Sequence, residues 1–290
     1  MIRQYIVKVE SDSKVVIPLF EEAMIAMPED DQVPLLYTQF LYSINEQPKA
    51  KPALERVLEI DASNTAARLM LLGLAVREND YLAVIEICKE GVIASPQTLE
   101  FHYYLAIAYN QAKEPNLVLS TIDKALQYVD ESTPSDLTSD FYAIQGDVYH
   151  ELGDYKKLYE SYDKALSYSS SNLGVLNNYA YYLSVQRKDL NKAEVMSKKT
   201  VDAEPKNATF LDTYAWILFE LKRYAEAKIY IEQALENGGD VSGVIIEHAG
   251  DVYYMLGEKE KAMELWLKAD TLDGGGPKLK QKIKRGKFIQ

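Results

Sequence analysis

LDTYAWILFELKRYAEAKIYIEQAL, residues 211–235, and IIEHAGDVYYMLGEKEKAMELWLKAD, residues 245–270, are the two stretches that decide the fold of this chain. Large apolar residues recur in both at spacings of three and four, which is the period of an amphipathic helix. Small residues in the second stretch lie 35 residues after those in the first, in the pairs Ala215 and Gly250, Ala227 and Ala262, and Ala234 and Ala269. A pair of helices joined by a short turn therefore occurs twice in succession.

The same pattern extends towards the N-terminus. Full units begin near residues 31, 65, 99, 139, 173, 208 and 243, at spacings of 34, 34, 40, 34, 35 and 35 residues. Residues 14–30 match only the second helix of a unit, and we expect Pro18 in its first turn, where a missing N–H costs little. Residues 2–10 have the spacing of a short helix. Leu72 stands where other units have a small residue, with Gly73 next to it, which predicts a local shift.

This order of large and small residues resembles the tetratricopeptide repeat, a helix-turn-helix of about 34 residues. The resemblance covers about residues 14–272 and implies an all-α fold, a right-handed superhelical solenoid of antiparallel helix pairs. Residues 1–273 would form the solenoid, and residues 274–290 a glycine-rich break with a basic capping tail. The blocks LDTYAW and EHAGDVYYMLG also resemble the terminal units of bacterial repeat proteins, some of which are associated with the cell envelope.

Two stretches depart from the repeat. The spacing of 40 places six extra residues within Asp130–Leu137, a polar stretch that predicts a longer surface loop. A change in the path of the superhelix at this point is the alternative. The repeats end at DGGGP, residues 273–277, because glycines and proline do not continue a helix. We expect the residues that follow to form a short helix that lays Leu279 and Ile283 on the last repeat.

Charge narrows the class of partner. The chain has a net charge of −12, but its last 13 residues carry six basic side chains and no acid, which leaves −18 on residues 1–277. An acidic body repels nucleic acid and anionic membranes, so a protein or peptide is the expected partner. Contact of the basic tail with an anionic surface is the weaker alternative. No apolar run is long enough to predict an integral membrane segment, and the compartment, cytoplasm or periplasm, stays open.

No pattern in the chain predicts catalysis. The histidines His102, His150 and His248 fall in different units, and no spacing typical of a metal site or a phosphate loop occurs. Glu247, His248 and Asp251 are the nearest approach to an acid–base cluster, but no nucleophile accompanies them. We therefore expect a protein that is not an enzyme and that uses no metal or cofactor.

The resemblance implies that one face of each first helix lines a concave groove where a partner lies. Carried over residue by residue, it gives nine candidate partner-binding residues: Asp147, Asn177, Tyr181, Asp212, Trp216, Phe219, Glu247, Asp251 and Tyr254. Some family members hold a terminal carboxylate in this groove with Lys, Asn and Arg. Here the matching positions of the last two units carry three acids and a tryptophan, so that mode is not expected.

Acids and aromatics dominate these nine positions. The acids favour a basic or neutral partner, and the alternative is an acidic helix face that is merely solvated. The aromatics are candidate anchors, and the alternative is that Trp216 packs against the first helix of the next unit. The expected function is a non-catalytic scaffold that binds a protein or peptide. A self-assembling structural element, stacking through the incomplete first unit into a homo-oligomer, is the alternative function.

Overall fold

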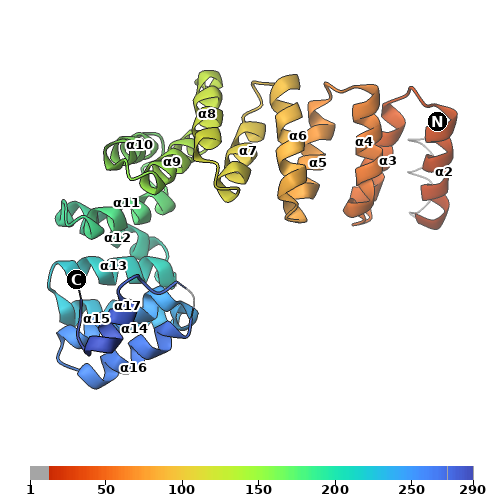
Figure 1. The fold of residues 1–290 in the computed structure, drawn as a ribbon. Helices are drawn as coiled ribbons and strands as arrows, with labels where there is room; N and C mark the ends of the chain where they lie inside the picture. Colours follow the sequence, from red (N-terminus) through yellow and green to blue (C-terminus); the bar gives the residue numbers. More distant parts are fainter. Residues whose placement is uncertain (1–12, 273, 290) are drawn as a thin grey trace. The chain divides into compact units, whose positions relative to one another are not determined.

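The computed structural model describes residues 13–272 and 274–289, and all regular secondary structure in these ranges is helical (Figure 1). This confirms the all-α class of consecutive helix pairs. The chain divides into two compact units, Met1–Leu158 and Tyr159–Gln290, which we describe separately. No helix within the described ranges is both long and apolar enough to cross a bilayer.

The first unit is built from helices that pack against their neighbours in chain order. α3 packs on α4, α5 on α6 and α7 on α8. α10 begins in this unit and ends in the second. The bounds are α2 Ser13–Ala26, α3 Gln32–Ser43, η1 Gln47–Ala50, α4 Lys51–Ile60, α5 Thr65–Arg77, α6 Tyr81–Ala94, α7 Leu99–Gln111, α8 Pro115–Ala125, η2 Leu126–Tyr128, α9 Ser135–Glu151 and α10 Tyr155–Tyr168.

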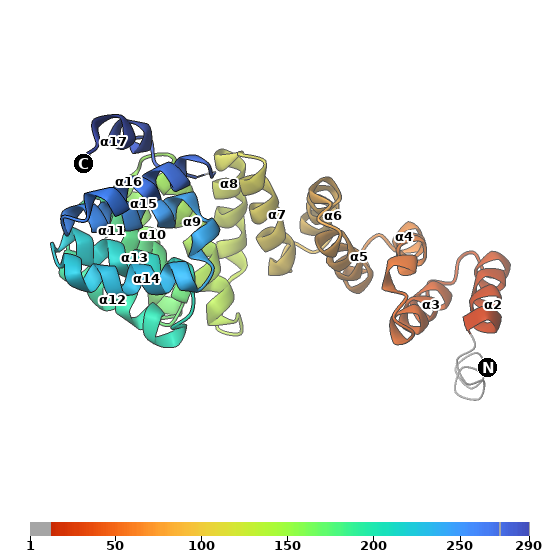
Figure 2. The same cartoon turned by 90° about the horizontal axis from the view of Figure 1, so that it is seen from below.

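The second unit repeats this arrangement and ends in a short extra helix. α11 packs on α12, α13 on α14 and α15 on α16, and the first helices α11, α13 and α15 also contact one another in series (Figure 1). α17 packs on α16 (Figure 2). The bounds are α11 Leu173–Val185, α12 Leu190–Ala203, α13 Ala208–Glu220, α14 Tyr224–Glu236, η3 Gly239–Val241, α15 Gly243–Met255, α16 Lys259–Asp270 and α17 Leu279–Arg285.

Local sequence sets where these helices begin and end. The side chains of Asn64, Asn172, Asn207 and Ser242 accept hydrogen bonds from backbone N–H groups in the first turns of α5, α11, α13 and α15. Each turn inside a pair contains a residue with a left-handed backbone, which stops the first helix. These residues are Asn45, Asn79, Lys113, Gly153, Arg187, Lys222 and Gly257, and their spacings are those of the sequence repeat.

The core between helices depends on small residues that admit large ones. Gly250 of α15 faces Trp266 of α16, and a Cβ on this glycine would lie 2.5 Å from the indole Cδ1. Trp266 is 1% exposed and belongs to the core of the second unit. In the first unit Gly91 plays the same part opposite Phe101. The crossing at Gly250 closes one helix pair, and the crossing at Gly91, between α6 and α7, lets one pair bury the apolar side of the next.

Three local expectations need correction or fall outside the described residues. Leu72 is 2% exposed and α5 begins at Thr65, so the predicted local shift is wrong, and Gly73 simply faces open space. Pro18 lies in the second turn of α2, between the buried side chains of Val16 and Phe20 that hold the helix in place. The helix predicted over residues 2–10 lies outside the described residues.

The extra residues before α9 are only partly a loop. Residues 135–137, predicted to belong to the loop, form the first turn of α9, which has 17 residues where α7 has 13. Pro134 stands just before the helix and Asp136 lies in its first turn, where an acid interacts favourably with the helix dipole. The insert therefore lengthens a helix as well as a loop.

Candidate functional site

Three carboxylates are buried together on the first helices of the second unit. Asp212 of α13 is 7% exposed, and Glu247 and Asp251 of α15 are 5% and 0% exposed. Glu247 and Asp251 are four residues apart, so they lie one turn apart on the same side of α15. We call the side of α13 and α15 that carries these carboxylates, together with the adjoining side of α11, the first-helix face.

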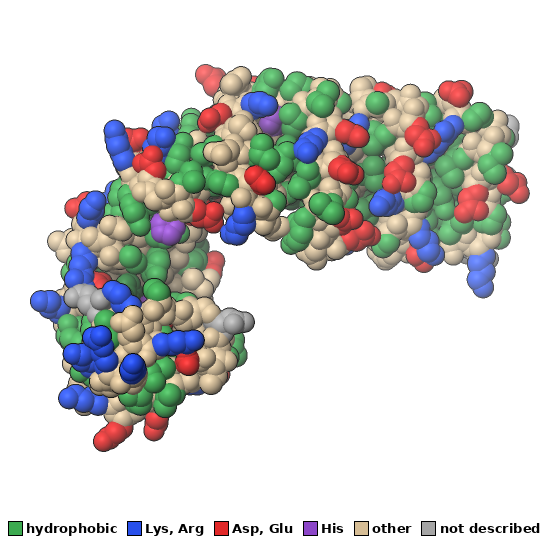
Figure 3. All heavy atoms as spheres, viewed as in Figure 1, with side chains coloured by type: hydrophobic (Ala, Val, Ile, Leu, Met, Phe, Trp, Pro, Cys, Tyr) green, Lys and Arg blue, Asp and Glu red, His purple; other side chains and the backbone are tan. Residues whose placement is uncertain are grey.

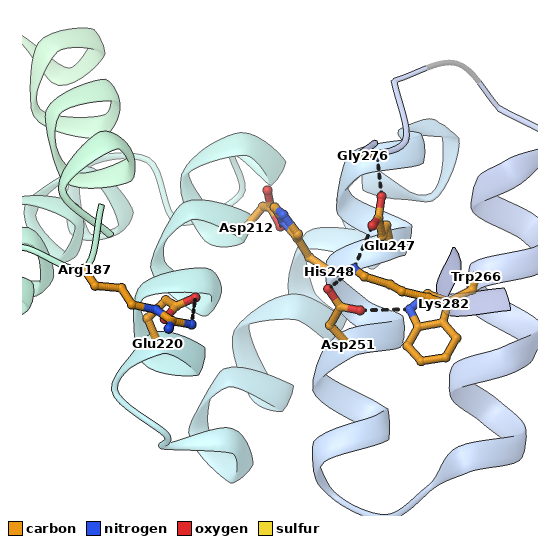
Figure 4. A network of polar contacts seen from close by, with 9 residues as sticks. All are labelled: Arg187, Asp212, Glu220, Glu247, His248, Asp251, Trp266, Gly276 and Lys282. Carbon is orange, nitrogen blue, oxygen red and sulfur yellow. Dashed lines mark hydrogen bonds and ion pairs between the residues drawn. The ribbon is translucent and has the colours of Figure 1, made fainter. Parts of the chain in front are cut away.

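The chain's own C-terminal segment, residues 274–289, supplies the cation for two of these acids. Lys282 of α17 is 5% exposed, and its Nζ lies 2.7 Å from Glu247 Oε1 and 2.5 Å from Asp251 Oδ2 (Figure 4). The backbone N–H of Gly276 donates to Glu247 Oε2, and Trp266 Nε1 donates to Asp251 Oδ1 at 3.0 Å. Each carboxylate therefore has two donors, which is what makes its burial tolerable.

The third carboxylate, Asp212, pairs with a histidine of the next repeat. Asp212 Oδ1 lies 2.9 Å from His248 Nδ1 (Figure 4). The imidazole also stacks on the indole of Trp216, with ring centroids 4.2 Å apart. The ring of Phe219 stacks on the same indole, with ring centroids 4.8 Å apart. Trp216 thus packs against α15, the first helix of the next repeat, which is the packing alternative considered from the sequence. Its Nε1 is buried and has no acceptor among the described residues.

A cavity of about 680 Å³ lies between the first-helix face and the C-terminal segment. Its walls include Tyr181 of α11, Trp216 of α13, His248 of α15 and Phe288 of the segment. Arg187 and Glu220 form an ion pair in the same wall, with Arg187 Nε 2.8 Å from Glu220 Oε2 (Figure 4). Both aromatic and charged side chains line this space, so it can contact apolar and charged groups at once.

The structure brings together some of the nine predicted residues and separates others. Tyr181, Trp216, Glu247 and Asp251 line the cavity, and Phe219 contacts Phe288 of the C-terminal segment at a ring distance of 5.3 Å. Asp212 does not line the cavity and instead pairs with His248, which does. Asn177 and Tyr254 do not line the cavity, and Tyr254 instead stacks on Trp266. Asp147 belongs to α9 of the first unit.

The acids differ from their expected setting, because those of the second unit are buried rather than lining an open groove. The residues missed from the sequence are Lys282 and Gly276, which donate to Glu247, Phe288 of the C-terminal segment, and the Arg187–Glu220 pair in the cavity wall. The pairing of His248 with Asp212 was also missed. The spacing gave no signal that selects Lys282, since it lies three residues after Leu279 just as Lys280 lies three residues before Ile283. Among residues 13–272 and 274–289, no group of three acids, histidines or cysteines is arranged to hold a metal ion.

Two members of this cluster, Asp251 and His248, have a pKa above the ordinary value. Burial raises the pKa of Asp251 to about 6, although the nearby Lys282 ammonium lowers it in part. For His248, burial lowers the pKa, but the adjacent Asp212 carboxylate outweighs this, with help from Asp251 and Glu247, and the pKa lies above its ordinary 6.5. Both groups therefore bind a proton more tightly in the folded chain than in the unfolded one.

This predicts that the second unit is more stable at mildly acidic pH. Stability from a raised pKa is complete below the unfolded value and is lost as pH rises through the folded one, which for Asp251 is from 3.8 to about 6. We expect the free energy of unfolding to be about 1 kcal/mol larger near pH 5.5 than near pH 8, with His248 adding to the difference. Urea titrations followed by tryptophan fluorescence at both pH values measure it.

Asp251→Asn is the matched variant, because the amide keeps the shape and cannot titrate. Its stability should change less between the two pH values than that of the parent chain. Equal pH dependence in both chains, or greater stability near pH 8, would contradict the assignment.

A family model described as "Tetratricopeptide repeat" matches residues 139–172 and 208–237. Among curated proteins, a TPR repeat-containing protein of Methanocaldococcus jannaschii is 24% identical over 208 residues, which are 67% of this chain and 34% of that protein. The chain thus spans about a third of the length of this relative.

Solved structures share the fold. A tetratricopeptide repeat protein from Parabacteroides merdae superposes with a TM-score of 0.62 at 14% identity, over 88% of this chain and 98% of that one. A chain in the APC/C hetero-tetramer Cut9–Hcn1 superposes with a TM-score of 0.68 at 14% identity, over 93% of this chain and 52% of that one. At these identities the likeness concerns the fold alone.

Proposed function

We propose, from the premise that this chain is a tetratricopeptide repeat protein, that it is a protein-interaction scaffold whose first-helix face binds a basic or neutral peptide segment. The observation that carries this proposal is the pair of buried carboxylates Glu247 and Asp251, which converge on one ammonium group. A face built to hold a lysine of its own chain has the charge and the geometry to hold a lysine of another.

The surroundings of the two carboxylates support a peptide rather than a small ion. The cavity beside them is about 680 Å³ and its wall includes Tyr181 and Trp216, which offer large rigid surfaces to apolar side chains. Asp212 pairs with His248, whose ring stacks on Trp216 and fixes the indole in place. Such a face would select partners by one cation and neighbouring apolar contacts, while the Cut9–Hcn1 hetero-tetramer shows a chain of similar fold within a protein complex.

Selection from a display library of random peptides on the immobilised full chain tests this function. We expect the recovered peptides to be enriched in lysine and depleted in acids. In the double variant Glu247→Gln/Asp251→Asn, the ratio of the affinities for a recovered lysine peptide and its lysine-to-glutamine counterpart should fall about tenfold, a loss of about 1.4 kcal/mol, because the variant removes both charges and keeps the side-chain shapes.

The matched control is Glu236→Gln/Asp240→Asn, which makes the same chemical changes at two exposed acids outside the first-helix face. It should bind like the parent chain. Recovery of acidic peptides, or equal loss of binding in both double variants, would show that these carboxylates do not select the partner.

A further inference from the structure

The attachment of the C-terminal segment has the features of a docked ligand. Apart from Lys282, its basic side chains Lys278, Lys280, Lys284, Arg285 and Lys287 are all exposed. Lysine and arginine side chains accordingly gather on the surface where Figure 1 places α17 (Figure 3). A helix that only capped the last repeat would need its apolar contacts alone, yet this one also carries a cation into the protein interior.

Two side chains define how the segment lies on the first-helix face. Lys282 places its ammonium between Glu247 and Asp251, and the aromatic ring of Phe288, six residues later, contacts Phe219 of α13. The Lys282 ammonium also lies 5.3 Å from the centre of the Phe288 ring. The lysine and the aromatic ring thus bridge α15 and α13, which belong to successive repeats.

The segment is joined to the last repeat by a stretch that favours release. Its first residues, Gly274, Gly275 and Gly276, precede α17, and ordering glycine costs more backbone entropy than ordering any other residue. Gly276 must be small where it lies, because a Cβ there would come within 3.1 Å of the Glu247 carboxylate. α17 itself has seven residues and would be marginal as an isolated helix. The docked state therefore depends on its contacts with the face.

We propose that the C-terminal segment is an internal competitor that occupies the first-helix face until a partner displaces it. The partner presents a lysine whose ammonium replaces that of Lys282 between Glu247 and Asp251, and an aromatic side chain about six residues later that replaces Phe288 against Phe219. This inference rests on the proposed function, and adds to it the partner's key side chains and the step that admits them.

The choice of lysine follows from the geometry. Glu247 Oε1 and Asp251 Oδ2 both lie within 2.7 Å of a single nitrogen, which suits a compact ammonium better than a planar guanidinium with its fixed fork of donors. A tethered segment is present at an effective concentration in the millimolar range, so it reduces the apparent affinity of any free competitor. Loosening it should raise that affinity in proportion.

The test measures binding of a fluorescein-labelled peptide with the sequence of residues 277–289, PKLKQKIKRGKFI, to the full chain by fluorescence anisotropy. Lys282→Gln in the chain weakens the docked segment, and the peptide should then bind at least tenfold more tightly than to the parent. Lys284→Gln is the matched control, since it makes the same change at an exposed lysine of the same helix. The control chain should bind the peptide like the parent.

A second peptide tests the lysine itself. The same peptide with glutamine in place of its Lys282 should bind the Lys282→Gln chain at least tenfold more weakly than the parent peptide. If Lys282→Gln lowers the helical circular dichroism of the chain, Phe288→Ser provides the second releasing variant, because it removes the other contact and leaves the carboxylates untouched.

The outcomes separate the two proposals. Equal peptide affinity for the parent, the releasing variant and the control would overturn the competition while leaving the face as a peptide site. Equal tightening in Lys282→Gln and Lys284→Gln would overturn it too, since a general charge effect would then explain the gain. Absence of binding to every chain, by both peptides, would count against the proposed function itself.

Discussion

Replacing Trp266 by alanine is expected to lower the free energy of unfolding of the second unit by about 3–5 kcal/mol. The indole is 1% exposed, fills the crossing of α15 and α16, and donates to the buried carboxylate of Asp251 at 3.0 Å. Alanine would leave a cavity and would also remove one of the two donors that make this burial tolerable. Urea unfolding followed by the fluorescence of Trp216, the remaining tryptophan, measures the loss.

Two phenylalanine variants separate the ring from its N–H group. Trp266→Phe keeps most of the packing and loses the donor, so it should cost about 1–3 kcal/mol. Trp216→Phe makes the same chemical change where the indole N–H has no acceptor among the described residues, and it should cost less. If the two variants lose equal stability, the hydrogen bond to Asp251 contributes nothing measurable.

Gly250→Ala should destabilise the same crossing by about 1–3 kcal/mol. The added methyl carbon would lie 2.5 Å from Trp266 Cδ1 and 3.2 Å from the carbonyl oxygen of Ala262, and a buried indole and a helix backbone have little room to move. The shift in the midpoint of urea unfolding, followed by circular dichroism, gives the size of the effect.

Gly73→Ala is the control for that substitution. Gly73 also lies inside a first helix, but a Cβ there would meet nothing within 4 Å. Alanine should therefore stabilise the chain by roughly 0.5–1 kcal/mol, because it is the better helix former. A loss of stability at Gly73, or a gain at Gly250, would contradict the packing described for these helices.

The fold could be predicted from the sequence because small residues at a regular spacing mark each repeat. Ala215 and Gly250 mark the crossings of their pairs, and the same period fixes where the turns must fall. The structure adds the reason that the turns keep this period: each contains a left-handed residue, yet only Gly153 and Gly257 among the seven are glycines. The turn residues Lys113 and Lys222 gave no signal, because nothing in a lysine predicts a positive φ.

The candidate site was only partly predictable for a different physical reason. Helical spacing places Glu247 and Asp251 on one face, and it does so whether the face meets solvent, a partner or the chain itself. What covers them depends on contacts with residues 29 to 35 positions further along the chain, in a segment that carries six cations of similar sequence context. The apolar neighbours Leu279 and Ile283 do not distinguish Lys282 from Lys280, because Lys282 is three residues after Leu279 and Lys280 is three residues before Ile283.

The pairing of Asp212 with His248 was likewise beyond the pattern. The two residues are 36 positions apart and belong to successive repeats. Their contact depends on how closely α13 and α15 approach, which is set by packing across the repeats. Because these helices lie close together, Trp216 is not the exposed anchor that was expected. Its ring stacks on both Phe219 and His248, and it also lines the cavity.

Hydrogen exchange of the C-terminal segment during titration with a lysine-bearing peptide tests the central claim most directly. If the first-helix face recognises a basic segment and now holds its own, the backbone amides of α17 and of Gly276 should exchange faster as the peptide saturates the chain, while those of α13 and α15 stay protected. Peptide that binds while the amides of residues 276–285 keep their full protection would contradict the claim.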